Sequence, residues 1–400
     1  MTDKTHPYPS YPYHRDSPYD PPPEFSLWRT QSPISKLSLW DGRTAWLVTG
    51  LDEVRTVLRD HDTFSSLPTA AGFPSLNPAD AGAKAPGMMQ LTDPPLHEVL
   101  RRAVQGEFTV KRVAERRVET ETIVTDLLDA IEARGGPVDL LSSLCAPVPA
   151  QFTCRQLGVP LTDAPFFAAS LSQRFDHTAE QVSSQDADQR LVNYFAGVVD
   201  DRRSEFRDDL SGRLVRDHVQ TGDLTAAQAA RILHVLLIAG FDTTKNMLAM
   251  STILLLNHPD ELARLQTDPA RWAAAIEEML RYLSVVQYQR RAVIRPVDIA
   301  GQRMEPGDGV LTALHAANRD PRAFDMPNRV DFERSHNIHL AFGSGIHQCL
   351  GQPVARMTLQ VTIPRLFERF QALRLAIPAN ELVYNEGQNI WGPRELPVTW

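Results

Sequence analysis

A single cysteine, Cys349, lies between glycines in the stretch from Phe342 to Gly351, just before a long amphipathic segment. Glycines adopt positive φ angles in tight turns, and they allow the backbone to approach a bulky, flat group. Near a cationic His347 and the start of a helix at about Pro353, the thiol of Cys349 is expected to ionise. A thiolate is a strong, soft ligand for iron, so this stretch predicts a metal-binding loop.

Other interpretations of the same stretch have less support. A lone cysteine among glycines is most often a structural thiol. The glycines Gly343 and Gly345 are weak evidence for a nucleotide-binding loop, because no strand and ribose-binding acid frame them. The three cysteines, Cys145, Cys154 and Cys349, are scattered and form no C-x-x-C pair, which disfavours zinc.

A second unusual stretch lies inside a long apolar segment. Thr225 and Gln228 form a capping box, and apolar residues continue to Leu256, so we expect a helix of about 30 residues. Its middle, residues 239–244, holds a glycine, a carboxylate and two threonines. Glycine costs about 1 kcal/mol relative to alanine inside a helix. A carboxylate in an apolar helix is costly unless it is paired or hydrated. The alternatives are a functional site and a kinked core helix with satisfied polar groups.

Composition excludes several classes of function. The chain has 400 residues and a net charge of −8, which disfavours a nucleic-acid partner. Its three cysteines fit a reducing cytoplasm better than a disulfide framework. Residues 1–23 have no apolar core, so they predict neither a signal peptide nor a membrane anchor. The most apolar run, residues 232–241, is too short to span a bilayer. We therefore expect a soluble, cytoplasmic protein, and a monomer.

The loop and the helix together resemble one family. Residues 342–351 match every fixed position of the cysteine-ligand loop of cytochrome P-450 enzymes, Phe-x-x-Gly-x-His/Arg-x-Cys-x-Gly. Residues 239–244 resemble the central-helix motif of that family, Ala-Gly-x-Asp/Glu-Thr-Thr. The resemblance covers nearly the whole chain and points to soluble bacterial, actinobacterial-type members. It implies that Cys349 binds the iron of haem b, with Phe342, Gly343 and Gly351 as parts of the cofactor loop.

The resemblance also implies which cations bind the haem propionates. His97 and Arg101 are spaced i,i+4, so they project from one face of a helix. Arg290 and His347 match the other two family positions, and Arg291 has a weaker claim. Two buried carboxylates require such cations. The competing interpretation of His97 and Arg101 is a solvated basic helix face.

The central-helix motif implies an oxygen-handling site. Ala239 and Gly240 would leave room over the iron. Asp242 would relay protons from solvent, and Thr243 would hydrogen-bond dioxygen or a nearby water. Lys245 has no role in this interpretation.

Two further sets of residues follow from the family pattern. Glu278 and Arg281 are expected to form a buried pair joined by Arg329, which holds the cysteine loop in place. A mostly apolar substrate cavity is expected to be lined by Val235, Ile238, Ala239, Val286, Tyr288, Ile390 and Trp391.

The resemblance implies a mainly α fold with small peripheral β-sheets. Residues 1–20 are expected to form a Pro- and Tyr-rich tail, and residues 21–400 a single haem-binding domain. The implied activity is oxidation of a small hydrophobic or aromatic molecule, such as a secondary metabolite, with O2 and electrons from a ferredoxin and its reductase. Two alternatives remain: a nitric oxide reductase-like or aryl-coupling enzyme, and a haem sensor without enzymatic activity.

Overall fold

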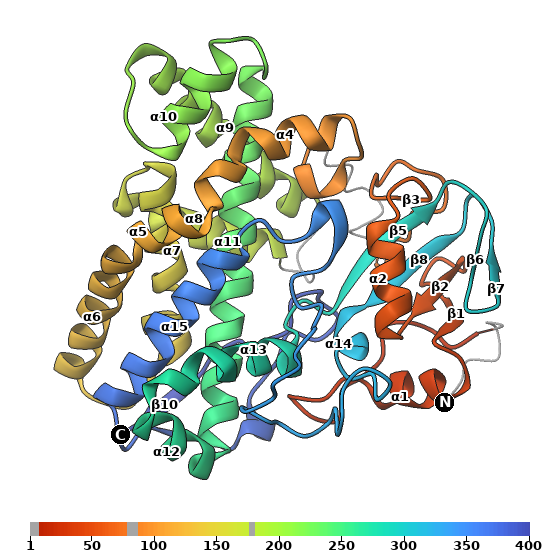
Figure 1. Cartoon of the computed structure of the whole chain (residues 1–400). Coiled ribbons are helices and arrows are strands. Elements are labelled where there is room, and N and C mark those ends of the chain that lie inside the picture. Colours follow the sequence, from red (N-terminus) through yellow and green to blue (C-terminus); the bar gives the residue numbers. More distant parts are fainter. Residues whose placement is uncertain (1–7, 78–86, 176–180) are drawn as a thin grey trace.

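The computed structural model describes residues 8–77, 87–175 and 181–400. Figure 1 shows a large helical part and, beside it, a smaller part that contains the main sheet. The chain is mainly helical with small sheets, so the predicted fold class is confirmed. None of the helices in the described ranges is long and apolar enough to cross a membrane.

Helix α11 (Ala226–Leu256) runs through the helical part and packs against α7, α9 and α15 (Figure 1). It has 31 residues, and the predicted capping box of Thr225 and Gln228 is present. Apolar residues cover most of its surface, because neighbouring helices bury it on several sides. The long central helix expected from the sequence is therefore confirmed.

The other α-helices surround α11 or cover the sheet. Their bounds are α1 (Pro23–Gln31), α2 (Leu51–Arg59), α4 (Leu96–Gln105), α5 (Val110–Glu115), α6 (Arg117–Arg134), α7 (Pro147–Leu157), α8 (Ala164–Phe175), α9 (Gln181–Ser204), α10 (Leu210–Leu214), α12 (Pro259–Thr267), α13 (Trp272–Leu283), α14 (Leu314–Ala317) and α15 (Gln352–Arg369).

The strands in the described part of the chain form three separate sheets. The largest has the order β1 (Ile34–Ser38), β2 (Thr44–Val48), β8 (Gly309–Ala313), β5 (Tyr288–Val293) and β3 (Phe64–Ser65). Only its β2–β8 pairing is parallel. The second has the order β4 (Val138–Asp139), β10 (Pro397–Thr399) and β9 (Arg374–Leu375), and the third pairs β6 (Val297–Ile299) with β7 (Gln302–Met304).

The cysteine loop lies directly before α15. Gly343 and Gly345 have φ angles of +67° and +74°, a region that favours glycine. The backbone N–H of Cys349 donates to the carbonyl of Phe342 at 2.9 Å, which closes the loop. Gly351 precedes the first turn of α15, which begins at Gln352 with a proline in that turn. The loop and helix start predicted from the sequence are thus present.

The described part of the expected tail, residues 8–20, packs on the body. The N–H of Tyr11 donates to the carbonyl of Ser38 at 3.1 Å, beside the first strand of the main sheet. Arg15 is buried, and its guanidinium donates to Gln287 Oε1 at 2.9 Å. Residues 8–20 therefore lie against β1 and against the segment just before β5.

Candidate functional site

Cys349 is exposed, although protein atoms surround it on most sides. Burial raises the pKa of its thiol, while backbone N–H groups of Gly351 and Gln352 and the cations Arg101 and Arg356 lower it. Burial has the larger effect, so the polypeptide alone does not favour the thiolate expected from the sequence. A bound metal deprotonates a coordinating thiol directly, and that is the remaining route to the ionised form.

Two histidines, one in the cysteine loop and one on α4, lie against each other. The ring centroids of His97, on α4, and His347 are 4.2 Å apart. All four of their ring nitrogens are buried without a hydrogen-bond partner among the described residues. Burial, then Arg291, His97 and Arg101, lower the pKa of His347 to about 2. The surrounding protein groups alone therefore do not favour the cationic His347 expected from the sequence.

Arg101 completes this group from α4, one turn after His97. Burial lowers the pKa of its guanidinium, and the nearby Cys349 raises it, which places Arg101 next to the loop. Partnerless ring nitrogens beside buried cations are the environment that bound carboxylates satisfy. The structure thus brings together three of the four predicted propionate residues.

The arginine of β5 that faces the histidine pair is Arg291 rather than Arg290. The two are neighbours on β5, so their side chains leave opposite faces of the sheet. Arg290 donates to the carbonyl of Pro74 at 3.3 Å and lies over the ring of Phe73. Arg291 is buried, and burial lowers the pKa of its guanidinium to about 10. Because Arg291 also lowers the pKa of His347, it faces the histidine pair. The alternation of side-chain direction along a strand was the signal that the sequence interpretation did not use, because it places Arg290 and Arg291 on opposite faces of β5.

One face of α11 is open at its middle. Ala239 is exposed and Thr243 is half-buried, although their neighbours along the helix are mostly buried. Thr243 Oγ1 donates to the carbonyl of Ala239 at 2.9 Å, the back-bond expected one turn earlier. A Cβ at Gly240 would lie 3.2 Å from Thr153 Oγ1, on α7, so the absence of a side chain at Gly240 also permits close packing of α11 on α7.

Asp242 is buried and forms an ion pair within α11. The Nζ of Lys245 lies 2.5 Å from Asp242 Oδ1, three residues further along the helix. This pairing offsets the cost of a carboxylate in an apolar helix. Lys245 had no role in the sequence interpretation, although the i,i+3 spacing of opposite charges was a visible signal.

The core ion-pair motif is present with a different third member. Glu278 and Arg281, on α13, are fully buried and joined by two hydrogen bonds of 2.7 Å. Arg334 Nε donates to the same carboxylate at 3.1 Å. Arg329 has an exposed side chain and contributes its backbone carbonyl, which accepts from Arg281. The third member is therefore Arg334, and the prediction of Arg329 is corrected.

The predicted substrate residues separate into two groups. Val286 and Ile390 are half-buried and lie opposite each other in an antiparallel bridge. Val235 and Ile238, on α11, are buried in the core cluster that contacts Leu350 of the cysteine loop. These four residues remain compatible with a pocket near Ala239.

Tyr288 and Trp391, the other two predicted substrate residues, make contacts away from this pocket. Tyr288 lies in the core beneath the main sheet, edge-on to Tyr11. Trp391 stacks on Tyr384 at 5.1 Å, and its indole donates to the carbonyl of Pro18. Trp391 directly follows Ile390, and adjacent residues of an extended segment point to opposite sides, so Trp391 turns away when Ile390 faces a pocket. The contacts of Tyr288 and Trp391 thus differ from the pocket lining predicted for them.

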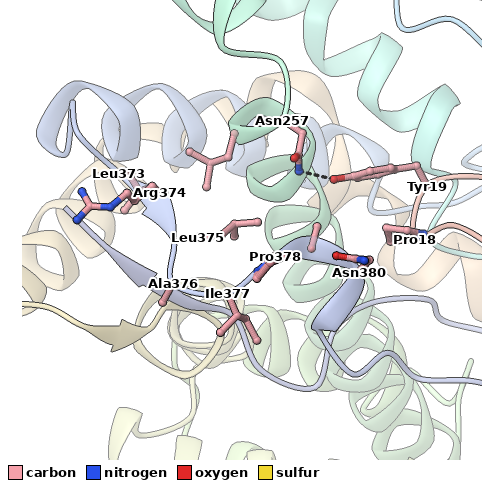
Figure 2. Close-up of a pocket in the computed structure, with 12 residues that line it drawn as sticks. Pro18, Tyr19, Asn257, Leu373, Arg374, Leu375, Ala376, Ile377, Pro378 and Asn380 are labelled. Carbon is pink, nitrogen blue, oxygen red and sulfur yellow. Dashed lines mark hydrogen bonds between the residues drawn. The ribbon is translucent and has the colours of Figure 1, made fainter.

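A groove of about 580 Å³ lies elsewhere, at the end of α11. Figure 2 shows Tyr19 and Asn257 on one side of it and the segment from Leu373 to Asn380 on the other. The hydroxyl of Tyr19 accepts a hydrogen bond from Asn257 Nδ2 at 2.5 Å. Asn257 follows Thr243 by 14 residues, which is about 21 Å along a helix. The groove is therefore separate from the cysteine site.

The residues at the cysteine site fit an iron porphyrin. Cys349 supplies one accessible soft ligand, and no cluster of three His, Cys, Asp or Glu side chains occurs in the described ranges. The partnerless nitrogens of His97 and His347, with Arg101 and Arg291, suit two carboxylates. The exposed Ala239 suits a flat apolar group. One thiolate, several propionate partners and a small-residue helix face define the class of haem-thiolate proteins.

Comparisons with known proteins agree with this class. The model of the cytochrome P-450 family matches residues 272–380. Pentalenic acid synthase from Streptomyces avermitilis is 38% identical, over 98% of this chain and 97% of its own. The 20-oxo-5-O-mycaminosyltylactone 23-monooxygenase of Streptomyces fradiae is 35% identical, over 98% of this chain and 92% of its own. The chain belongs to the cytochrome P-450 family.

A solved structure supports the same assignment. The mycinamicin VIII methyl hydroxylase of Micromonospora griseorubida, bound to mycinamicin VIII, has a TM-score of 0.93 and 33% identity. The match covers 98% of this chain and all of that one. The family implies a haem-iron cofactor, a small-molecule substrate and a redox partner.

Proposed function

We propose that the protein is a haem b monooxygenase that oxidises a small hydrophobic or aromatic molecule, with O2 and with electrons from a ferredoxin and its reductase. The observation that carries this proposal is the accessible Cys349 in a closed loop beside the partnerless His97 and His347. The comparisons supply the family, and the site residues supply the mode of cofactor binding.

Each site residue has a proposed task around the cofactor. Cys349 binds the iron. His97, His347, Arg101 and Arg291 hold the propionates. Phe342 and the glycines of the loop shape the cofactor's thiolate side, and the ring of Phe342 is fixed by the guanidinium of Arg356 at 4.6 Å. When bound, haem supplies the activation of O2 that no amino-acid side chain can provide.

Asp242 and Thr243 are proposed to manage protons on the other side of the cofactor. Thr243 has its hydroxyl hydrogen directed to Ala239, so its oxygen lone pairs remain available to accept a hydrogen bond from a water. Asp242 is the buried acid next to it in sequence, and it is proposed to bring protons in from solvent. This acid–alcohol pair favours oxygen activation over haem sensing.

The proposed substrate is a secondary metabolite. The pentalenic acid synthase and the macrolide-lactone monooxygenase are relatives whose names state such products or substrates. Val286, Ile390, Val235, Ile238 and Ala239 are apolar, which suits a largely hydrophobic molecule. The protein is proposed to act as a monomer in the cytoplasm, where its ferredoxin partner is available.

The experiment is a ligand screen of the haem-loaded protein followed by turnover. Binding is read as a low-spin to high-spin shift of the haem spectrum. A ligand that binds is then incubated with ferredoxin, ferredoxin reductase, NADPH and oxygen-18-labelled O2. We expect one labelled oxygen atom in the product. Val286→Trp should raise the dissociation constant of the ligand, measured from the spin shift, at least tenfold. Turnover that consumes nitric oxide, or couples aryl rings without incorporating label, would contradict the monooxygenase proposal.

A further inference from the structure

An ion pair sits in the middle of the most apolar helix of the protein. Lys245 Nζ and Asp242 Oδ1 are 2.5 Å apart, and the two side chains are 19% and 9% exposed. The ammonium also lies over the ring of Phe241, at 5.7 Å from its centroid. Lys245 is therefore held on two sides, and it is the more exposed member of the pair.

Helix geometry places Asp242 between two faces of α11. Successive residues turn by about 100° around an α-helix, so Lys245 lies about 60° to one side of Asp242. Ala239 and Thr243 lie on the other side, about 60° and 100° away. The ion pair thus draws the carboxylate toward Lys245 and away from the open face that carries Thr243.

The backbone at Asp242 is fixed while its side chain can turn. Asn246 Nδ2 donates to the carbonyl of Asp242 at 2.9 Å. The amide of Asn246 is itself wedged against Gly392, where a Cβ would lie 2.0 Å from Asn246 Oδ1. Any exchange of partners by the Asp242 carboxylate therefore has to occur by side-chain rotation and not by movement of the helix.

We propose that Lys245 is a positioning residue for the Asp242 carboxylate, which it holds turned away from Thr243 until the carboxylate exchanges the ammonium for water. This inference rests on the proposed monooxygenase function, in which Asp242 moves protons. Lys245 thus sets the resting orientation of the Asp242 side chain, and loss of the ammonium would leave that orientation undefined.

The experiment compares Lys245→Met with Lys245→Arg. Met removes the charge and keeps a long side chain, whereas Arg keeps the ion pair. Crystal structures report the orientation of Asp242 without any need for turnover. We expect the carboxylate to leave the Lys245 side in Lys245→Met and to stay there in Lys245→Arg. If Lys245→Met yields no folded protein, Lys245→Gln takes its place.

Coupled turnover, measured as product formed per O2 consumed, provides the second readout. Lys245→Met should lower it about tenfold, which is less than the roughly hundredfold or larger contribution of a positioned proton donor because Asp242 itself is retained, and Lys245→Arg should keep it near the wild-type value. In an Asp242→Asn background, Lys245→Met should change nothing further, because Lys245 acts through Asp242.

Two outcomes would overturn the inference. One is an unchanged Asp242 orientation in Lys245→Met. The other is an equal loss of coupling in the wild-type and Asp242→Asn backgrounds. A protein that binds no haem or oxidises no ligand would instead contradict the proposed function. The crystal structures would still decide where Lys245 holds the carboxylate.

Discussion

At Glu278, two arginines meet one carboxylate in the interior. Arg281 binds both oxygens, and Arg334 adds a third charged hydrogen bond from the polar segment before the cysteine loop. The backbone N–H of Asp331 donates to Glu278 as well, at 2.9 Å. These bonds join α13 to the polar segment. Because the carboxylate of Glu278 is buried, removal of one of its arginine partners would leave its charge only partly neutralised.

The first prediction compares Arg334 with Arg329, five residues away in the same segment. Arg334→Ala should lower the free energy of unfolding by about 2 kcal/mol or more, since it removes a charged hydrogen bond to a buried carboxylate. Arg329→Ala should change it by no more than about 0.5 kcal/mol, because the Arg329 side chain is exposed. Urea denaturation of both variants measures the difference. Equal losses would contradict the assignment of Arg334.

The second prediction compares the two arginines of β5. Arg291→Gln should increase the rate of haem transfer to an apoprotein acceptor about tenfold, the factor that corresponds to one charge-assisted hydrogen bond. Arg290→Gln should have a smaller effect, because Arg290 lies on the other face of the strand against Pro74 and Phe73. A larger effect at Arg290 would restore the original sequence-based choice.

Sequence patterns located the motifs better than they located single side chains. The ten-residue loop and the residues of α11 were found because their spacing and composition are unusual. Arg290 and Arg329 were predicted where the structure has Arg291 and Arg334, one and five residues away. Strand alternation shows that Arg290 and Arg291 point to opposite sides, but which of them points inward depends on the register of the strand, and the position of Arg334 depends on the path of an irregular segment. The partner of Asp242 was missed although its spacing was visible.

At the scale of elements, Glu277 joins three segments around the cysteine loop. It lies on α13, its carboxylate binds Arg356 of α15 at 2.7 Å, and His339 Nε2 is 3.1 Å away. Burial raises the pKa of Glu277, but hydrogen bonds and charges of His339 and Arg356 outweigh it and lower the pKa to about 2. The ion pair thus helps to hold α15 against α13.

The third prediction is a window of pH dependence. The folded pKa of Glu277, about 2, is below its ordinary value of 4.5. Its stabilising effect is therefore complete above pH 4.5 and disappears as the pH falls toward 2. Glu277→Gln should lower the melting temperature above pH 4.5, and its difference from wild type should shrink below that pH. Arg356→Met removes the partner of Glu277. In that background, Glu277→Gln should therefore lower the melting temperature by less than it does in the wild type. A constant difference at all pH values would contradict the ion pair.

Helices and loops could be predicted where the residues of a single continuous segment determine where they begin and end. The capping box and Pro259 define α11 by themselves, and glycines with positive φ define the cysteine loop. Residues 1–20 were expected to form a tail, and no pattern indicated its partners: Arg15 and Pro18 contact Gln287 and Trp391, which lie 272 and 373 residues further along the chain. Contacts across such separations depend on the complete fold, so local patterns gave no sign of them.

At the scale of the whole molecule, charge is unevenly distributed. The chain has a net charge of −8, but α4 and α5 carry the exposed cations Arg102, Lys111 and Arg112, and α5 packs against α15, the helix that follows the cysteine loop. Exposed Val110 and Val118, at 76% and 71%, lie among these cations. A basic surface with apolar residues beside the cofactor loop suits an acidic electron donor.

The fourth prediction tests this surface. Reversing the charge at Arg102 and Arg112 together should slow reduction by ferredoxin at least tenfold at low salt, and added salt should reduce the difference. Turnover driven by hydrogen peroxide should stay unchanged. Arg43→Glu with Arg303→Glu changes the net charge equally, in the part that holds the main sheet, and should leave both rates unchanged. Equal loss in both assays would show damage to the haem site rather than to docking.

The central claim is that Cys349 is the iron ligand, and one spectrum tests it most directly. The protein is loaded with haem, reduced and exposed to carbon monoxide. Thiolate ligation predicts a strongly red-shifted Soret band for the wild type, and loss of that band in haem-loaded Cys349→Ser, with Cys154→Ser unchanged as the control. Survival of the red-shifted band in Cys349→Ser would contradict the account.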